Sequence, residues 1–148
     1  MPRRTIAGFA AALIVMVTPL FAQSREAFTA RLDWVPIGGA ERSDVAGQGS
    51  AKATLSGSRL SITGSFEGLP ARVTGAKLHR GVATGARGRG TVVAELSVSG
   101  DATGTLAGET RLSAEQVAAL KAGQLYVQVY SEKGVSPDHS TLWGWLLP

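Results

Sequence analysis

The sequence predicts an all-β protein, namely a Greek-key-like antiparallel β-sandwich of about eight strands with one short connecting helix. From Phe28 onward, apolar and polar residues alternate with the period of two that indicates strands. Glycine-containing turn signals separate these runs, and only one segment departs from the pattern. The 148 residues, 44% of them hydrophobic, suffice for one domain with its own core. Because the chain has no cysteine, disulfides and thiol chemistry are excluded.

The strands follow from the alternation and from the turns between them. Gly57 and Ser58 separate two alternating runs and therefore predict a β-hairpin. Pro70 ends the second of these runs, because proline cannot continue a ladder of backbone hydrogen bonds. The expected strands cover residues 28–34, 51–56, 60–66, 72–79, 91–98, 102–108, 124–131 and 141–146.

One segment carries the signals of a short helix. Ser113 is followed three residues later by Gln116, which is the capping-box pattern of a helix start. Helix-forming residues continue to Lys121, and Gly123 is placed for a C-terminal stop. We expect about two helical turns that carry the chain across one end of the sandwich.

The first 22 residues have the parts of a secretory signal peptide. Arg3 and Arg4 precede an uncharged apolar run, Pro19 interrupts it, and Ala22 supplies a small residue at the cleavage position. We therefore expect cleavage after Ala22 and a secreted or periplasmic protein without a membrane span, acting as a monomer. The alternative is an N-terminal membrane anchor, since the stretch of residues 5–24 lacks charge and approaches the length of a spanning helix.

Several segments resemble the chordin-type CHRD domain. The residues GAKLHRG at 75–81 resemble its central AHIHG segment, and residues 28–32 match its F.A.L opening. The segment SAEQ at 113–116, leading into LYVQVYS at 125–131, is similar to its LTAEQ…AGNLYVNVHT block. The resemblance implies one CHRD-like domain over residues 28–147, after a signal peptide at residues 1–22. It also implies an exported all-β module without enzymatic activity, found alone in bacteria and repeated in the animal protein chordin.

The chain departs from the family pattern at two histidine positions. Lys77 stands where the family has its first histidine, and Tyr130 replaces the histidine of the VHT segment. Of the three histidines in the AHIHG and VHT segments, this chain keeps only the one at His79. A cluster of histidines, if relatives have one, is therefore reduced here to a single imidazole.

The positive charge is concentrated in one segment. The formal net charge is +4, and without Arg3 and Arg4 the chain has 13 basic and 11 acidic residues. Residues 72–89, called the basic segment below, contain five cations and no acid: Arg72, Lys77, Arg80, Arg87 and Arg89. Arginines among flexible glycines suit an anionic extracytoplasmic partner. Nucleic acid is disfavoured, because the segment lacks aromatic residues for base stacking. The alternative is a solvated loop with ordinary arginines.

Aromatic residues give a second candidate surface. In the run 124–131, Tyr126, Gln128 and Tyr130 share the face opposite Leu125, Val127 and Val129. Such a face can bind a partner or carbohydrate, but we favour cross-strand packing of the tyrosines on a half-exposed sheet. Trp143 and Trp145 also share one face. For these two residues we favour core packing or closure of one end of the sandwich over a displayed sugar platform.

The sequence gives no catalytic residue, metal ligand set or cofactor. Asp138, His139 and Ser140 have the residue types of a catalytic triad, but adjacent residues cannot form its relay. The alternative is a metal-binding or redox protein distantly like copper-zinc superoxide dismutase. The candidate binding residues are Lys77, His79, Arg80, Arg87, Arg89, Tyr126, Gln128 and Tyr130.

Overall fold

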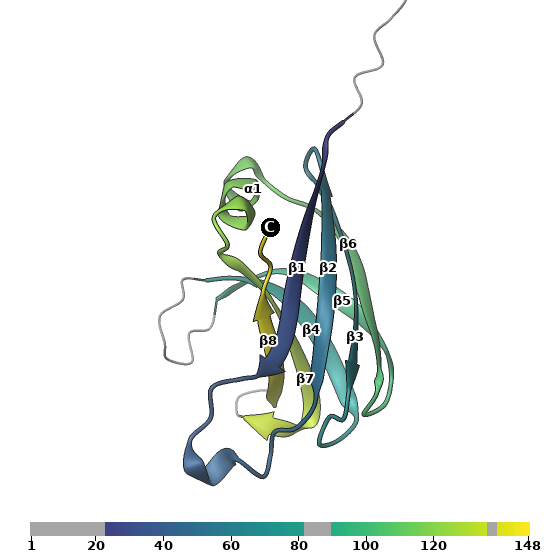
Figure 1. Cartoon of the computed structure of the whole chain (residues 1–148), viewed down its shortest axis with the longest axis vertical. Coiled ribbons are helices and arrows are strands. Elements are labelled where there is room, and N and C mark those ends of the chain that lie inside the picture. The colour runs from purple at the N-terminus through teal and green to yellow at the C-terminus, as the bar shows by residue number, and fades with distance from the viewer. Residues whose placement is uncertain (1–22, 82–89, 136–138) are drawn as a thin grey trace, which may run out of the picture.

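A computed structural model describes residues 23–81, 90–135 and 139–148. Within these residues the chain forms eight antiparallel strands, one 3₁₀ turn and one α-helix (Figure 1). The predicted signal peptide lies outside the described residues. No helix in the described ranges combines the length and apolar character needed to cross a membrane. The elements are β1 Arg25–Trp34, η1 Gly39–Glu41, β2 Gln48–Ser56, β3 Arg59–Glu67, β4 Val73–Arg80, β5 Thr91–Gly100, β6 Gly104–Arg111, α1 Ala114–Lys121, β7 Leu125–Val135 and β8 Ser140–Trp145.

The strands close into a barrel in the order β1-β2-β3-β6-β5-β4-β7-β8. Strands β4, β5 and β6 follow one another as hairpins, and β7 then returns through α1 to lie beside β4. That order is a Greek key. The prediction of an all-β fold of eight antiparallel strands with one short helix is confirmed.

The predicted sandwich is wrong, because β8 pairs with β1 and closes the sheet. Asp33 lies opposite Trp143, and Thr29 exchanges two backbone hydrogen bonds with Leu147, of 2.7 and 2.9 Å. Gly144 permits this approach, since a Cβ at that position would collide with the carbonyl oxygen of Arg31. Inward and outward residues alternate in the same way in sandwiches and barrels. The alternation alone therefore could not distinguish the two.

The barrel interior is filled by the apolar half of each alternating strand. Leu32, Leu60, Leu78, Val127 and Leu142 are all 0% exposed and belong to one continuous hydrophobic cluster. This burial is the main favourable contribution to folding, at roughly 25 cal/mol per Å² of apolar surface. The residues on the alternate positions point outward, and those on β4, β7 and β8 form the site described below.

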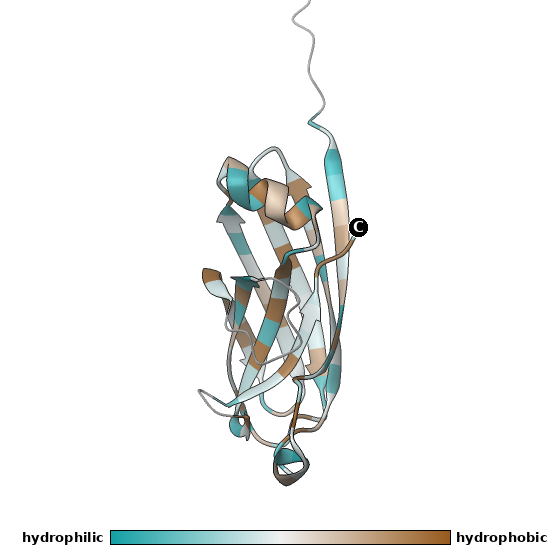
Figure 2. Cartoon of the chain, turned by 90° about the vertical axis from the view of Figure 1, so that its left-hand side faces the viewer, coloured by the Kyte–Doolittle hydropathy of each residue, from teal (hydrophilic) through white to brown (hydrophobic). Residues whose placement is uncertain are grey.

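Helix α1 covers one end of the barrel, as the sequence predicts (Figures 1 and 2). The side chain of Ser113 accepts a hydrogen bond from the Gln116 backbone, and the Gln116 side chain accepts one from the Ser113 backbone. Ala119 and Leu120 are buried in the main hydrophobic cluster. Lys121 forms an ion pair of 2.7 Å with Glu26 at the start of β1, which further attaches the helix to the barrel.

Candidate functional site

The outer surface of β4, β7 and β8 carries the candidate site. In the register of these strands, His79 lies opposite Tyr126, and Tyr126 lies opposite Trp145. Gln128 occupies the next outward position of β7, opposite Lys77 on one side and Trp143 on the other. Residues directly opposite on neighbouring strands point to the same face of a sheet. The aromatic face, as we call it, consists of His79, Tyr126, Tyr130, Trp143 and Trp145.

His79 belongs to β4, which flanks β7 on the side away from β8, and is 6% exposed. A register shift between Leu78 and His79 leaves one extra residue on β5, which is a β-bulge beside the imidazole. The His79 Nδ1 lies 3.0 Å from the Gly90 carbonyl oxygen, and its Nε2 lies 2.8 Å from the Tyr130 hydroxyl. A carbonyl only accepts, so Nδ1 donates, and Nε2 of the neutral ring accepts the Tyr130 hydroxyl proton.

Burial lowers the pKa of His79 below its ordinary value of 6.5. The hydrogen bond to Gly90 acts in the opposite direction, and the nearby charge of Lys77 lowers the pKa further. The imidazole is therefore kept neutral, in agreement with the tautomer that its two hydrogen bonds require.

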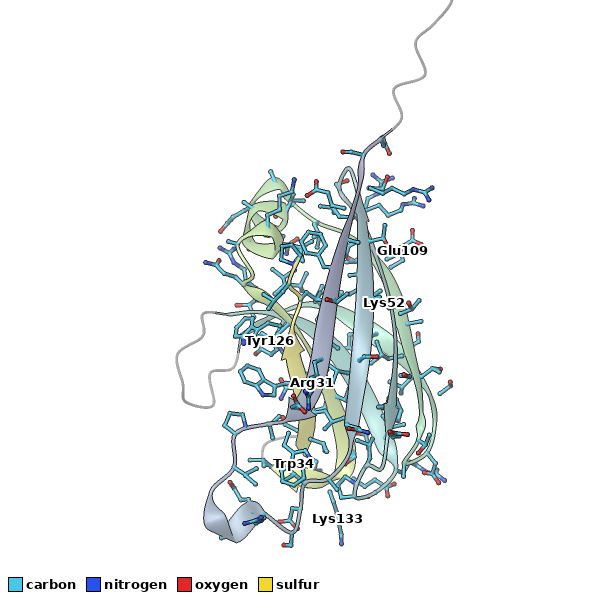
Figure 3. All side chains as sticks on the ribbon, viewed as in Figure 1. Arg31, Trp34, Lys52, Glu109, Tyr126 and Lys133 are labelled. Carbon is cyan, nitrogen blue, oxygen red and sulfur yellow. The ribbon has the colours of Figure 1, made fainter. Side chains whose placement is uncertain are left out.

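Tyr126 joins the imidazole to the tryptophans. Its ring is stacked on His79, with centroids 5.0 Å apart and an interplanar angle of 8°. It meets Trp145 and Trp143 edge-to-face, at centroid distances of 5.0 and 5.7 Å. Figure 3 shows Tyr126 on the outside of the barrel beside β8. Contacts of this kind add about 0.5–1.5 kcal/mol per pair beyond the buried area.

Gly81 and Gly90, which follow β4 and precede β5, pack closely against this cluster. The Gly90 backbone N–H donates to the Tyr126 hydroxyl at 2.9 Å, while the Gly90 carbonyl accepts from His79. A Cβ at Gly90 would collide with the Arg80 carbonyl oxygen and would lie 3.0 Å from Tyr126 Cε1. Glycine is therefore required here for the backbone to reach both rings.

Trp143 and Trp145 do not fill the barrel interior, and the predicted core packing is found only for Trp143, at a small cluster separate from the main core. Both indoles lie on the outer face of β8, 5.5 Å apart by centroid, and both are partly exposed. Their orientation follows from Leu142, which points inward and leaves positions 143 and 145 outward. Trp143 also packs against a small separate cluster of Val35, Val45 and Val135.

The tyrosines are less accessible than a binding surface of tyrosine and glutamine requires. Tyr126 is 3% exposed and Tyr130 is 9% exposed, whereas Gln128 is half-buried. The structure therefore shows the cross-strand packing of the tyrosines that we favour from the sequence. Lys77 Nζ lies 5.7 Å from the centre of the Tyr130 ring, which places a cation at the edge of the aromatic face.

The described cations of the basic segment all have acidic partners. Arg72 pairs with Asp101 at 3.2 Å, Lys77 with Glu95 at 3.4 Å, and Arg80 with Glu115 at 2.7 Å. Exposed pairs of this kind are worth about 0–1 kcal/mol, so they can exchange with a ligand. Arg87 and Arg89 lie outside the described residues.

The two histidines are not brought together as a chelating pair. Both ring nitrogens of His79 have hydrogen-bond partners, and His139 lies at the turn before β8 with a positive φ of 58°. Across residues 23–81, 90–135 and 139–148, no group of three or more His, Cys, Asp or Glu side chains could hold a metal. The interpretation as a metal-binding or redox protein receives no support from this geometry.

Sequence reasoning missed the role of Gly90 and the outward direction of the indoles. A signal for the second was present, because Trp143 and Trp145 alternate with Leu142 and Leu146. The role of Gly90 left no such signal, since its contacts join β4, β7 and the start of β5.

The fold and the ordered motifs define a class of all-β module, and a comparison with known families identifies it. The family model of the CHRD domain matches residues 28–136, so the chain belongs to the CHRD-domain family. The resemblance stated from the sequence is thereby confirmed. Searches among curated proteins and among solved structures gave no match.

Proposed function

We propose that the protein is an exported, non-enzymatic CHRD module that binds an acidic extracytoplasmic partner at the aromatic face and the adjoining basic segment. The observation that carries this proposal is the position of Trp143 and Trp145. Both indoles are partly exposed on the outside of a barrel whose interior is already filled by other residues. The fold does not need them for its main core.

The aromatic face has the properties of a preorganised binding surface. His79 and Tyr126 form its buried base, and their polar atoms are occupied by the Gly90 backbone and by Tyr130. The indole rings of Trp143 and Trp145 pack against Tyr126 of this base, which restricts their motion. Because little conformational entropy remains to be lost, a partner that covers the indoles retains more of its contact energy.

The acidic character of the partner is inferred from the basic segment. Lys77 shares the outward face of β4 with His79, whereas Arg80 alternates to the other face and pairs with Glu115 of helix α1. In the sequence, Arg87 and Arg89 follow Arg80. Since Lys77 and Arg80 already pair with Glu95 and Glu115, the electrostatic part of the proposal depends mainly on Arg87 and Arg89.

The proposed cellular location rests on the pattern of the first 22 residues. Their charge and apolar pattern support cleavage after Ala22 and release of a secreted or periplasmic protein, with an N-terminal membrane anchor as the alternative. Expression of the full chain followed by N-terminal sequencing of the exported form tests this. A mature start at Gln23 is expected, and a retained Met1 in the membrane fraction contradicts it.

The electrostatic part of the proposal is tested by reversing charge. The Arg87→Glu, Arg89→Glu variant is expected to lose salt-sensitive binding to acidic envelope or matrix polymers. The matched control is Arg42→Glu, Lys133→Glu, which changes the net charge equally. Loss in the first variant alone supports the proposal. Unchanged binding by the first variant contradicts the electrostatic part.

The aromatic part needs a separate pair of variants. Trp145→Ala is expected to weaken retention of the partner by about tenfold, because a buried indole anchor is worth more than 1 kcal/mol. Trp34→Ala is the control: Trp34 is 45% exposed but lies on β1, outside the aromatic face. Equal effects of the two substitutions contradict a role for the aromatic face.

A further inference from the structure

Three arginines that lie far apart in the sequence form one row across β1, β2, β3 and β6. Arg25 on β1 lies opposite Ser56 on β2, Ser56 lies opposite Arg59 on β3, and Arg59 lies opposite Arg111 on β6. Neighbouring strands are spaced by roughly 4.8 Å, so the backbone positions of the row extend over about 14 Å. All four side chains point outward, because Leu55 and Leu60 beside them point into the core.

This row lines a polar hollow on the outer surface of β1, β2, β3 and β6. The hollow has a volume of about 650 Å³. Besides the three arginines, its lining includes the hydroxyl groups of Ser56, Ser58 and Ser61. Figure 3 labels Glu109, which also lines it, near the end of the barrel where β1 begins. The aromatic face lies on β4, β7 and β8, so the two surfaces share no strand.

The charges in the hollow are not balanced by the chain itself. Arg59 pairs with Glu109 at 3.0 Å, but in the described ranges Arg25 and Arg111 form no ion pair. Arg59 and Arg111 stand directly opposite each other, and like charges in that relation destabilise a sheet. An anion between the two guanidinium groups would remove this repulsion.

The chemistry of the lining selects the class of ligand. Guanidinium groups bind carboxylate and sulfate oxygens through paired hydrogen bonds, and serine hydroxyls can bond to sugar hydroxyls. Arg25 and Arg59 are separated by about two strand spacings, or about 10 Å, so one small anion does not bridge them. We propose that this arginine row, Arg25, Arg59 and Arg111, binds successive acidic groups of a polysaccharide that carries sulfate or carboxylate. The proposal goes beyond the partner inferred for the aromatic face.

The row is tested by neutralising the two unpaired arginines in the full protein. Arg25→Gln, Arg111→Gln is expected to weaken binding of heparin by tenfold or more, because each charged contact is worth about a factor of ten. The slope of log affinity against log salt concentration should fall in magnitude by about two. The control is Arg42→Gln, Lys133→Gln, with the same loss of charge. Lys133 lies at the other end of the barrel (Figure 3).

The opposite change gives a second, independent test. Glu109→Gln removes the acid from the hollow and releases Arg59, so heparin affinity is expected to rise several-fold. Glu132→Gln is the control, since Glu132 is exposed and does not line the hollow. Unfolding temperatures of all variants show whether each protein is folded.

The outcomes separate the ligand classes and the two surfaces. Tighter binding of heparin than of polygalacturonate assigns sulfate to the row, and the reverse assigns carboxylate. Tighter binding of polyphosphate than of both polysaccharides overturns the proposal. An affinity of inorganic sulfate equal to that of heparin, when heparin is compared per sulfate group, also overturns it. Equal losses in the Arg25/Arg111 variant and its control also overturn it. Heparin binding that Arg25→Gln, Arg111→Gln weakens and Arg87→Glu, Arg89→Glu leaves unchanged supports the row and contradicts the electrostatic part of the proposed function. The reverse result overturns the row and supports the proposed function.

Discussion

The imidazole of His79 lies parallel to the ring of Tyr126, with 5.0 Å between the centroids. One backbone unit, Gly90, bonds to both residues: its carbonyl accepts from His79 and its N–H donates to the Tyr126 hydroxyl. The base of the aromatic face is therefore fixed by two hydrogen bonds to one glycine, one from each side chain. A substitution at any of these three residues should change the positions of the other two.

Folding stability should depend on pH through His79. Because burial lowers its pKa in the folded state, the unfolded chain takes up the proton first as pH falls below 6.5. The free energy of unfolding should receive the full contribution of His79 above pH 6.5. It should lose that contribution as pH falls toward the pKa of the folded state. Urea unfolding at a series of pH values measures this.

The control for this pH effect is the other histidine. His139→Ala should keep the decrease, and His79→Gln should remove it. If the His79 variant does not fold, an NMR titration of the unaltered protein still decides the matter. An imidazole of His79 that titrates at or above 6.5 contradicts the prediction.

Removal of the Tyr130 hydroxyl should destabilise the protein and raise the pKa of His79. In Tyr130→Phe the buried Nε2 of His79 loses its donor, which costs about 1–3 kcal/mol. The lost bond favoured the neutral imidazole, so protonation becomes easier. Tyr126→Phe is the matched variant, because it removes a hydroxyl that bonds to Gly90 and not to His79. Equal pKa changes in both variants would speak against the assigned tautomer.

An added methyl group at Gly90 should disturb the site. In Gly90→Ala the new Cβ meets the Arg80 carbonyl and lies 3.0 Å from Tyr126 Cε1. Overpacking of this kind costs about 1–3 kcal/mol. Gly39→Ala is the control, since a Cβ there has no neighbour within 4 Å. Thermal unfolding compares the two, and similar midpoints would show that the approach of Gly90 is not required.

The cap of helix α1 should contribute measurably to stability. Ser113→Ala removes the acceptor for the Gln116 backbone N–H, which lies 3.1 Å from Ser113 Oγ. The expected loss is about 1 kcal/mol. Ser43→Ala, at an exposed position outside the helix, should have little effect on the urea midpoint. A loss at Ser43 as large as that at Ser113 would contradict the assignment of the cap.

The sequence was sufficient to predict the elements but not their closure. The alternation in β2 and β3 and the capping box of α1 depend on neighbouring residues, so a single sequence reveals them. The contact of β1 with β8 joins Asp33 to Trp143, and no local pattern encodes it. The prediction of a sandwich failed at that long-range contact.

The same distinction applies to the candidate sites. The shared face of Lys77 and His79 followed from their spacing on one strand. The arginine row did not, because Arg25, Arg59 and Arg111 become neighbours only through the register of four strands. Along the sequence, positive charge is concentrated in residues 72–89, where the cations are close in the chain. The structure shows that three of these have acidic partners.

The seam between β1 and β8 also has a consequence for the order of folding. The strand that closes the barrel, β8, is the last to be synthesised, and contacts between such distant segments form slowly. Until β8 docks, β1 and β7 have open edges that can pair with other chains. Trp143 and Trp145 lie on that same closing strand. Docking of β8 therefore adds the two indoles to the outer surface and covers the open edges of β1 and β7 in the same step. Only the closed barrel can present the aromatic face.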